Sequence, residues 1–143
     1  MFFYNSLHML DMIYRLPLIW AEGIVVVETH DNPIMAKNLS DFWGRKWDKA
    51  VQMMLKDVVF TPVFDRYGLQ AAVWLTFAAS GVLHVYALLW GGSSYTQCAY
   101  MLAFFLLQPL LLELDTRFKL HWFPLLSLTA PLFLEPFLTI AGW

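Results

Sequence analysis

The clearest pattern in the chain is an uncharged apolar run over residues 69–90, which is long enough to cross a membrane as a helix. A short polar turn follows at residues 91–94, and residues 95–112 form a second long apolar run. Two spanning helices joined by so short a turn must run antiparallel. The sequence therefore predicts a membrane-spanning helical hairpin over residues 69–112.

The segment before the hairpin, from Glu28 to Gly68, mixes charged side chains with aromatic ones. Ser40 is expected to cap a helix that runs from Asp41 to about Lys56. Because its apolar positions keep helical spacing, this helix is predicted to be amphipathic and to lie at the membrane surface. These positions are Phe42, Trp43, Trp47, Val51, Met54 and Leu55.

The two ends of the chain complete the predicted architecture. The N-terminal stretch predicts a helix partly buried in protein, and residues 113–121 predict a second charged loop. Residues 122–143 contain three prolines, which favours either a kinked spanning helix or a re-entrant segment. We therefore expect an all-α integral membrane protein with three to four membrane helices plus an interfacial amphipathic helix, as a single domain over residues 1–143.

Composition and charge agree with this class. The chain is 59% hydrophobic and 14% charged, against about 25% charged residues in an average soluble domain. The formal net charge of -2 argues against nucleic acid as a partner, and the lone Cys98 excludes a disulfide scaffold. The loops before and after the hairpin hold eight of the nine Lys and Arg residues, so we expect both loops on the cytoplasmic side or its organellar equivalent.

His84 is an ionisable residue inside the first predicted spanning helix. Thr76, Ser80 and His84 follow one another at four-residue spacing and so share one helix face. Such residues usually face a bundle interior or a water-filled cavity and carry function. From spacing alone, a functional histidine and one that merely bonds across helices remain equally good interpretations. The small residues 78–81 predict the close approach of another helix at this level.

Other candidate groups carry less information. His121, next to Trp122, is expected at the membrane interface, and Glu135 is a second ionisable residue in an apolar segment. No spacing of His, Cys or carboxylate residues is typical of a metal site, so no metal is expected.

Two sequence motifs resemble the wax synthase branch of the membrane-bound O-acyltransferase (MBOAT) family. Residues 38–48 contain Asp41-Phe-Trp-Gly-Arg-Lys-Trp47, which is similar to the family's Asp/Glu-Phe-Trp-Gly-Arg-x-Trp segment. Residues 77–84 contain Ser80-Gly-Val-Leu-His84, which is similar to its Ser-Gly-x-x-His helix. Residues 104–108 and 131–136 resemble the end of the same domain, so the resemblance covers residues 31–136.

The resemblance implies transfer of a long-chain acyl group from acyl-CoA to an alcohol. His84 would be the general base, because an alcohol attacks a thioester poorly unless its proton is removed as the bond forms. Asp48 matches the polar residue that accompanies this histidine, and acyl-CoA would be a co-substrate, with no bound cofactor. Arg45 and Lys46 would meet the phosphates of coenzyme A. The substrate-binding residues implied are Trp43, Arg45, Lys46, Trp47 and Ser80.

Chain length decides between two hypotheses at this point. The family's enzymes are typically more than twice as long, because further helices enclose the acyl and acceptor tunnel that aligns the reactants. The length therefore favours a structural, lipid-binding subunit of a larger assembly in an organellar energy-converting membrane, with membrane lipids and other membrane subunits as partners. The alternative is a long-chain acyl-CoA:alcohol O-acyltransferase of the endoplasmic reticulum.

Overall fold

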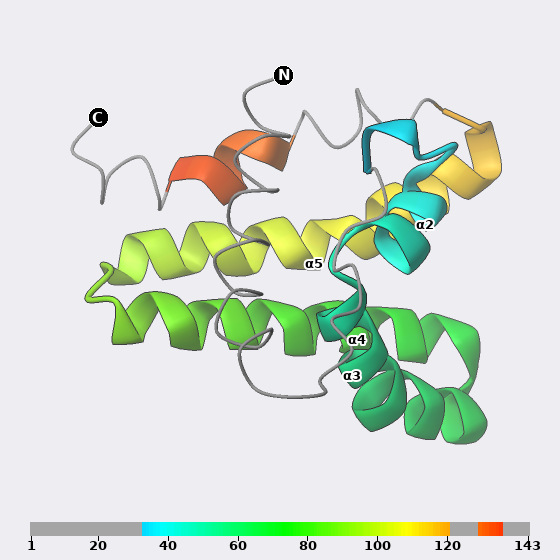
Figure 1. Cartoon of the computed structure of the whole chain (residues 1–143), viewed down its shortest axis with the longest axis horizontal. Coiled ribbons are helices and arrows are strands. Elements are labelled where there is room, and N and C mark those ends of the chain that lie inside the picture. Colours follow the sequence, from blue (N-terminus) through cyan, green and yellow to red (C-terminus); the bar gives the residue numbers. More distant parts are fainter. Residues whose placement is uncertain (1–32, 121–128, 136–143) are drawn as a thin grey trace, which may run out of the picture.

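The computed structural model describes residues 33–120 and 129–135, and this part of the chain is helical apart from short turns (Figure 1). Two helical stretches are long and apolar enough to cross a membrane, Lys49–Trp90 and Tyr95–Phe118. The predicted all-α class is confirmed for these residues, whereas a third or fourth span is not. The predicted N-terminal helix and most of the last apolar segment lie outside the described residues.

The predicted hairpin is confirmed as helices α4 (Thr61–Trp90) and α5 (Tyr95–Phe118), which pack side by side along their length (Figure 1). The turn between them contains Gly92 at a φ of +80°, a conformation that glycine adopts without steric cost. Ser94 and Gln97 then form a capping box, in which each side chain accepts a hydrogen bond from the other's backbone N–H. The turn at Gly92 thus follows the end of α4, and the capping box begins α5.

Helix α5 extends beyond its expected end at Leu112, so residues 113–118, predicted as part of a charged loop, are helical. Glu113 and Arg117 stand one helical turn apart, and their side chains form an ion pair at 2.6 Å. An ion pair between residues four positions apart stabilises a helix, which helps these charged residues to continue α5.

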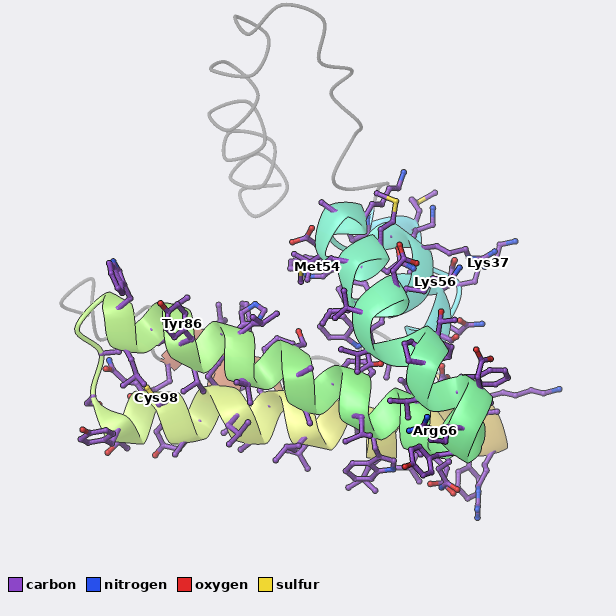
Figure 2. All side chains as sticks on the ribbon, turned by 90° about the horizontal axis from the view of Figure 1, so that it is seen from below. Lys37, Met54, Lys56, Arg66, Tyr86 and Cys98 are labelled. Carbon is purple, nitrogen blue, oxygen red and sulfur yellow. The ribbon has the colours of Figure 1, made fainter. Side chains whose placement is uncertain are left out.

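Helices α4 and α5 are in close contact at Gly81. A Cβ atom at this position would lie 3.0 Å from Leu102 Cδ1 and 3.1 Å from Phe105 Cβ. The close approach expected from the small residues 78–81 is therefore confirmed at Gly81. Figure 2 shows Cys98 between the two helices and Tyr86 on the outer face. The buried core of the hairpin consists of Leu88, Cys98, Met101, Phe104 and Phe105.

The segment before the hairpin departs from the single helix predicted over residues 41–56. It forms α2 (Leu39–Asp41), a π-helical turn (Phe42–Lys46), α3 (Lys49–Leu55) and a second π-helical turn (Lys56–Phe60) that leads into α4. Within α4, Gly68 has a φ of +82° and kinks the helix directly before the predicted span.

The predicted cap at Ser40 is wrong, because Asn38 caps α2 by accepting the Asp41 backbone N–H at 2.7 Å. A second cap interrupts the predicted helix. Asp48 adopts a left-handed conformation (φ +34°) and its Oδ1 atom accepts the Val51 backbone N–H at 3.1 Å, which starts α3. Asp is one of the few non-glycine residues that tolerate this conformation. The chain therefore bends at Asp48, and α3 runs in a new direction.

Three contacts place this bent segment and the helical residues 129–135 against α5. The backbone N–H of Leu39 donates to the buried Asp115 carboxylate at 2.8 Å. The Trp43 ring lies 6.1 Å from that of Phe104, which in turn lies 5.0 Å from the Phe133 ring. The hairpin is thus covered by two further pieces of chain that meet at the middle of α5.

The close contact at Gly81 predicts that a larger side chain there separates the hairpin. Gly81→Leu is expected to lower the free energy of unfolding by about 1–3 kcal/mol, because the added atoms overlap Leu102 and Phe105. Unfolding in mixed micelles measures this loss. Ala87→Leu is the matched control, since Ala87 is exposed on the same helix. Equal stability of the two variants would show that the helices do not pack at Gly81.

Candidate active site

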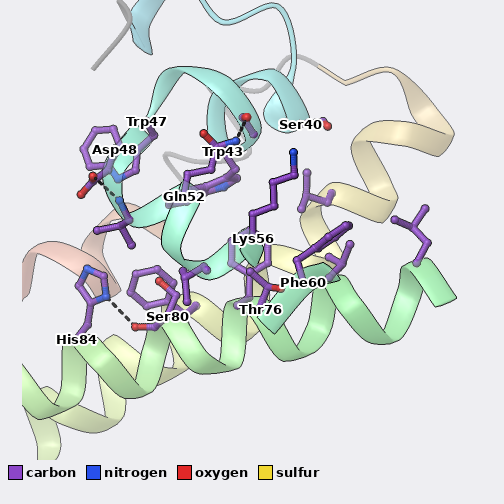
Figure 3. A pocket seen from close by; sticks show the side chains of 18 of the residues that line it. Ser40, Trp43, Trp47, Asp48, Gln52, Lys56, Phe60, Thr76, Ser80 and His84 are labelled. Carbon is purple, nitrogen blue, oxygen red and sulfur yellow. Dashed lines mark hydrogen bonds between the residues drawn. The ribbon is translucent and has the colours of Figure 1, made fainter. Parts of the chain in front are cut away.

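A cavity of about 540 Å³ lies between the bent segment and the helical hairpin (Figure 3). The bent segment contributes Trp43, Trp47, Asp48, Gln52 and Lys56 to its lining, and α4 contributes Val73, Thr76, Phe77, Ser80 and His84. Five of the seven site residues predicted from the sequence therefore line one cavity. These are Trp43, Trp47, Asp48, Ser80 and His84.

The histidine is held by its own helix. His84 Nδ1 lies 2.8 Å from the backbone carbonyl oxygen of Ser80, one turn earlier (Figure 3). A carbonyl oxygen can only accept, so Nδ1 carries the hydrogen of the neutral ring and Nε2 keeps its lone pair. The ring also packs on Phe105, with centroids 4.4 Å apart. The arrangement leaves Nε2 as the proton-accepting atom of a half-buried imidazole.

Asp48 lines the same cavity from the opposite element. Its carboxylate caps α3 through the Val51 N–H, as described above, and the left-handed backbone at Asp48 turns the chain at the cavity wall. Among the described residues, no hydrogen bond joins Asp48 to His84. The structure therefore brings the two predicted catalytic residues to one cavity without bonding them to each other.

The two tryptophans build the apolar wall. Trp43 packs edge-on against Phe77, with ring centroids 5.6 Å apart, and also faces Phe105 at 6.3 Å. Trp47 stacks on Phe42, with centroids 5.3 Å apart. Because the Phe105 ring also packs against the His84 ring, this aromatic cluster connects the bent segment to the histidine.

Arg45 and Lys46 do not line the cavity. The Arg45 side chain is 73% exposed, and its Nε atom pairs with Oδ1 of the buried Asp41 at 2.8 Å. The hydrogen bond from the Lys37 backbone N–H, helped by the Arg45 charge, holds the pKa of the Asp41 carboxyl below its ordinary value of 3.8. Arg45 thus has a structural partner at the protein surface, and contact of Arg45 and Lys46 with coenzyme A stays a prediction.

Lys56, a cationic side chain that was not predicted as a site residue, also lines the cavity. Lys56 points into the cavity space from the π-helical turn after α3 (Figure 3). Asp48, Gln52, Lys56 and Phe60 all line the cavity at four-residue intervals, so this spacing was the signal in the sequence. Within the part of the chain that the structure describes, no group of three or more His, Cys, Asp or Glu side chains could hold a metal ion.

Comparison with known proteins identifies the family. Residues 27–107 match the family model described as the membrane bound O-acyl transferase family. This range contains both sequence motifs and every predicted site residue. No solved structure matches the chain.

Curated relatives agree with this match. The chain is 30% identical over 92 residues to the "Probable long-chain-alcohol O-fatty-acyltransferase 7" of Arabidopsis thaliana, covering 59% of this chain and 27% of the relative. It is 33% identical over 61 residues to the "Acyl-CoA--sterol O-acyltransferase 1" of the same plant, covering 38% of this chain and 18% of the relative.

The chain thus spans about a fifth to a quarter of the length of these relatives. The resemblance to the wax synthase branch is confirmed by the family match and by the long-chain-alcohol relatives. Together with the two long apolar helices, the match identifies an integral membrane protein. The chain belongs to the membrane bound O-acyl transferase family.

Proposed function

We propose that this chain takes part in the transfer of a long-chain acyl group from acyl-CoA to a long-chain alcohol. The observation that carries the proposal is the His84 imidazole, whose Nδ1 is bonded to the Ser80 carbonyl while its ring lines an aromatic cavity. A neutral imidazole held in this way is suited to general base catalysis.

In the proposed reaction, the alcohol oxygen attacks the thioester carbonyl carbon while His84 Nε2 removes the hydroxyl proton. The new carbon–oxygen bond forms, the carbon–sulfur bond breaks, and His84 returns the proton to the departing coenzyme A sulfur. The imidazolium that forms between these steps carries a positive charge. The Ser80 carbonyl, as hydrogen-bond acceptor of Nδ1, stabilises this charge, and the Asp48 carboxylate on the same cavity adds to it.

The walls of the cavity suit substrates with long apolar bodies. Phe77 and Val73 from α4 face Trp43 and Trp47 from the bent segment. Lys56 supplies a positive charge among these apolar side chains, so it can attract the anionic coenzyme A part of the donor. The two relatives are named for acyl transfer to long-chain alcohols and to sterols, and both acceptors are hydroxyl groups on apolar molecules.

The enzyme is better supported than the structural subunit that chain length favoured. The family match covers the histidine helix and the aromatic motif, and the relatives carry the names of acyltransferases. Because the chain covers only about a fifth to a quarter of those relatives, the activity and its location in the endoplasmic reticulum are both part of the proposal.

His84→Ala tests the role of the base. The protein, given labelled long-chain acyl-CoA and a long-chain alcohol, is expected to form the ester. The substitution should lower turnover about 100- to 10,000-fold, which is the usual contribution of a positioned base. Leu83→Ala, at the exposed neighbouring position, is the control and should retain turnover. Equal turnover in His84→Ala and wild type, with both proteins folded, would show that His84 is not the general base.

Two substitutions at Asp48 separate its cap from its charge. Asparagine caps helices and tolerates the left-handed conformation, so Asp48→Asn is expected to keep the stability of the wild type. Asp48→Ala loses the cap, which costs about 1 kcal/mol. If the carboxylate supports the His84 charge, Asp48→Asn lowers turnover about tenfold, equivalent to about 1.4 kcal/mol. Full turnover in Asp48→Asn would show that the Asp48 charge does not assist His84 and that Asp48 acts only as a helix cap.

A further inference from the structure

Gln108, in the middle of α5, is a polar residue with no exposed surface. It lies behind Trp43 and does not line the cavity. An amide buried in apolar surroundings is costly unless its donors and acceptor are bonded. The contacts of Gln108 therefore indicate what holds it there.

The Gln108 amide joins α5 to two other segments of the chain. Its Oε1 atom accepts the indole Nε1–H of Trp43 at 3.2 Å. Its Nε2 atom donates to the Phe104 carbonyl oxygen at 3.1 Å and to Thr129 Oγ1 at 3.2 Å. An indole nitrogen can only donate and a backbone carbonyl can only accept, so the amide has one orientation that satisfies both. If the amide were flipped, its NH2 group would point at the Trp43 indole N–H, and two donors would face each other.

This fixed amide determines how the Trp43 indole lies on the cavity wall. One edge of the indole is tied to Gln108, and its ring packs on Phe77 and Phe105. The Phe105 ring also packs against the His84 ring, with centroids 4.4 Å apart. A rotation of the indole would therefore change the shape of the cavity next to His84.

We propose that Gln108 is a positioning residue, which acts through Trp43 to set the shape of the apolar cavity in which the substrate binds. The inference rests on the proposed function for the identity of the ligand, an acyl chain or a long-chain alcohol. The positioning of the indole itself does not depend on that function. The test therefore has one spectroscopic and one kinetic measurement.

The spectroscopic measurement follows the indole N–H signal of Trp43 in the ¹H–¹⁵N spectrum of the detergent-solubilised protein. The signal is assigned by its absence in Trp43→Phe. In Gln108→Leu, which is apolar and cannot accept a hydrogen bond, the signal is expected to move and to exchange faster with water. Gln70→Leu, on the exposed surface of α4, is the matched control and should leave it unchanged. An unchanged signal in Gln108→Leu would overturn the proposal.

The kinetic measurement compares KM and kcat for the long-chain alcohol. Gln108→Leu is expected to raise KM about three- to tenfold, the range that one hydrogen bond supplies, with little change in kcat. Trp43→Phe should raise KM similarly. It provides the same test if Gln108→Leu does not fold. The double variant should show no further increase, because both substitutions remove the same bond. Fully additive effects, or a normal KM in Trp43→Phe, would contradict the positioning role.

The two measurements keep the proposals apart. A protein that forms no ester but shows the shifted indole signal would refute the proposed function and support the positioning of Trp43. A protein that forms the ester with an unshifted signal would refute the positioning and leave the proposed function standing.

Discussion

The contact between α4 and α5 at Gly81 is the constraint on which the candidate site depends. Because glycine has no side chain, Phe105 of α5 can reach the backbone of α4 one turn before His84. The Phe105 ring then packs against both the His84 imidazole and the Trp43 indole. A wider spacing of the helices would remove this ring from both partners, so the position of His84 follows from the packing of the hairpin.

Two buried polar side chains on α5 fix the bent segment over that hairpin. Asp115 accepts the backbone N–H of Leu39 near one end of the segment, and Gln108 accepts the indole N–H of Trp43 a few residues later. In apolar surroundings an unpaired polar group is costly, so each of these bonds has few alternatives. The segment that closes the cavity is thus fixed at two points along the same helix, and the cavity wall is defined before any substrate arrives.

Periodicity predicted the parts of this structure that local rules determine. The hairpin, its turn and the face shared by Ser80 and His84 follow from helical spacing and membrane thickness. The break at Asp48 did not follow, because the apolar positions on both sides keep the spacing of one continuous helix. The role of Gln108 was not predicted, because it depends on Trp43, which is far away in the sequence. Lys56 was not predicted as a cavity residue, because the four-residue spacing from Asp48 through Gln52 to Lys56 shows that they share a face but not which surface that face meets. The ion pair between Arg45 and Asp41 was not predicted either, although the two residues stand one helical turn apart.

The tautomer of His84 is the most direct test of this account. In the ¹⁵N-labelled protein, at a pH where the ring is neutral, the imidazole signals of His84 can be assigned by their loss in His84→Ala. We expect a protonated Nδ1, bonded to the Ser80 carbonyl, and an unprotonated Nε2. A proton on Nε2 with a bare Nδ1 would contradict the account, because Nδ1 could not then donate to Ser80 and Nε2 could not accept a proton from an alcohol.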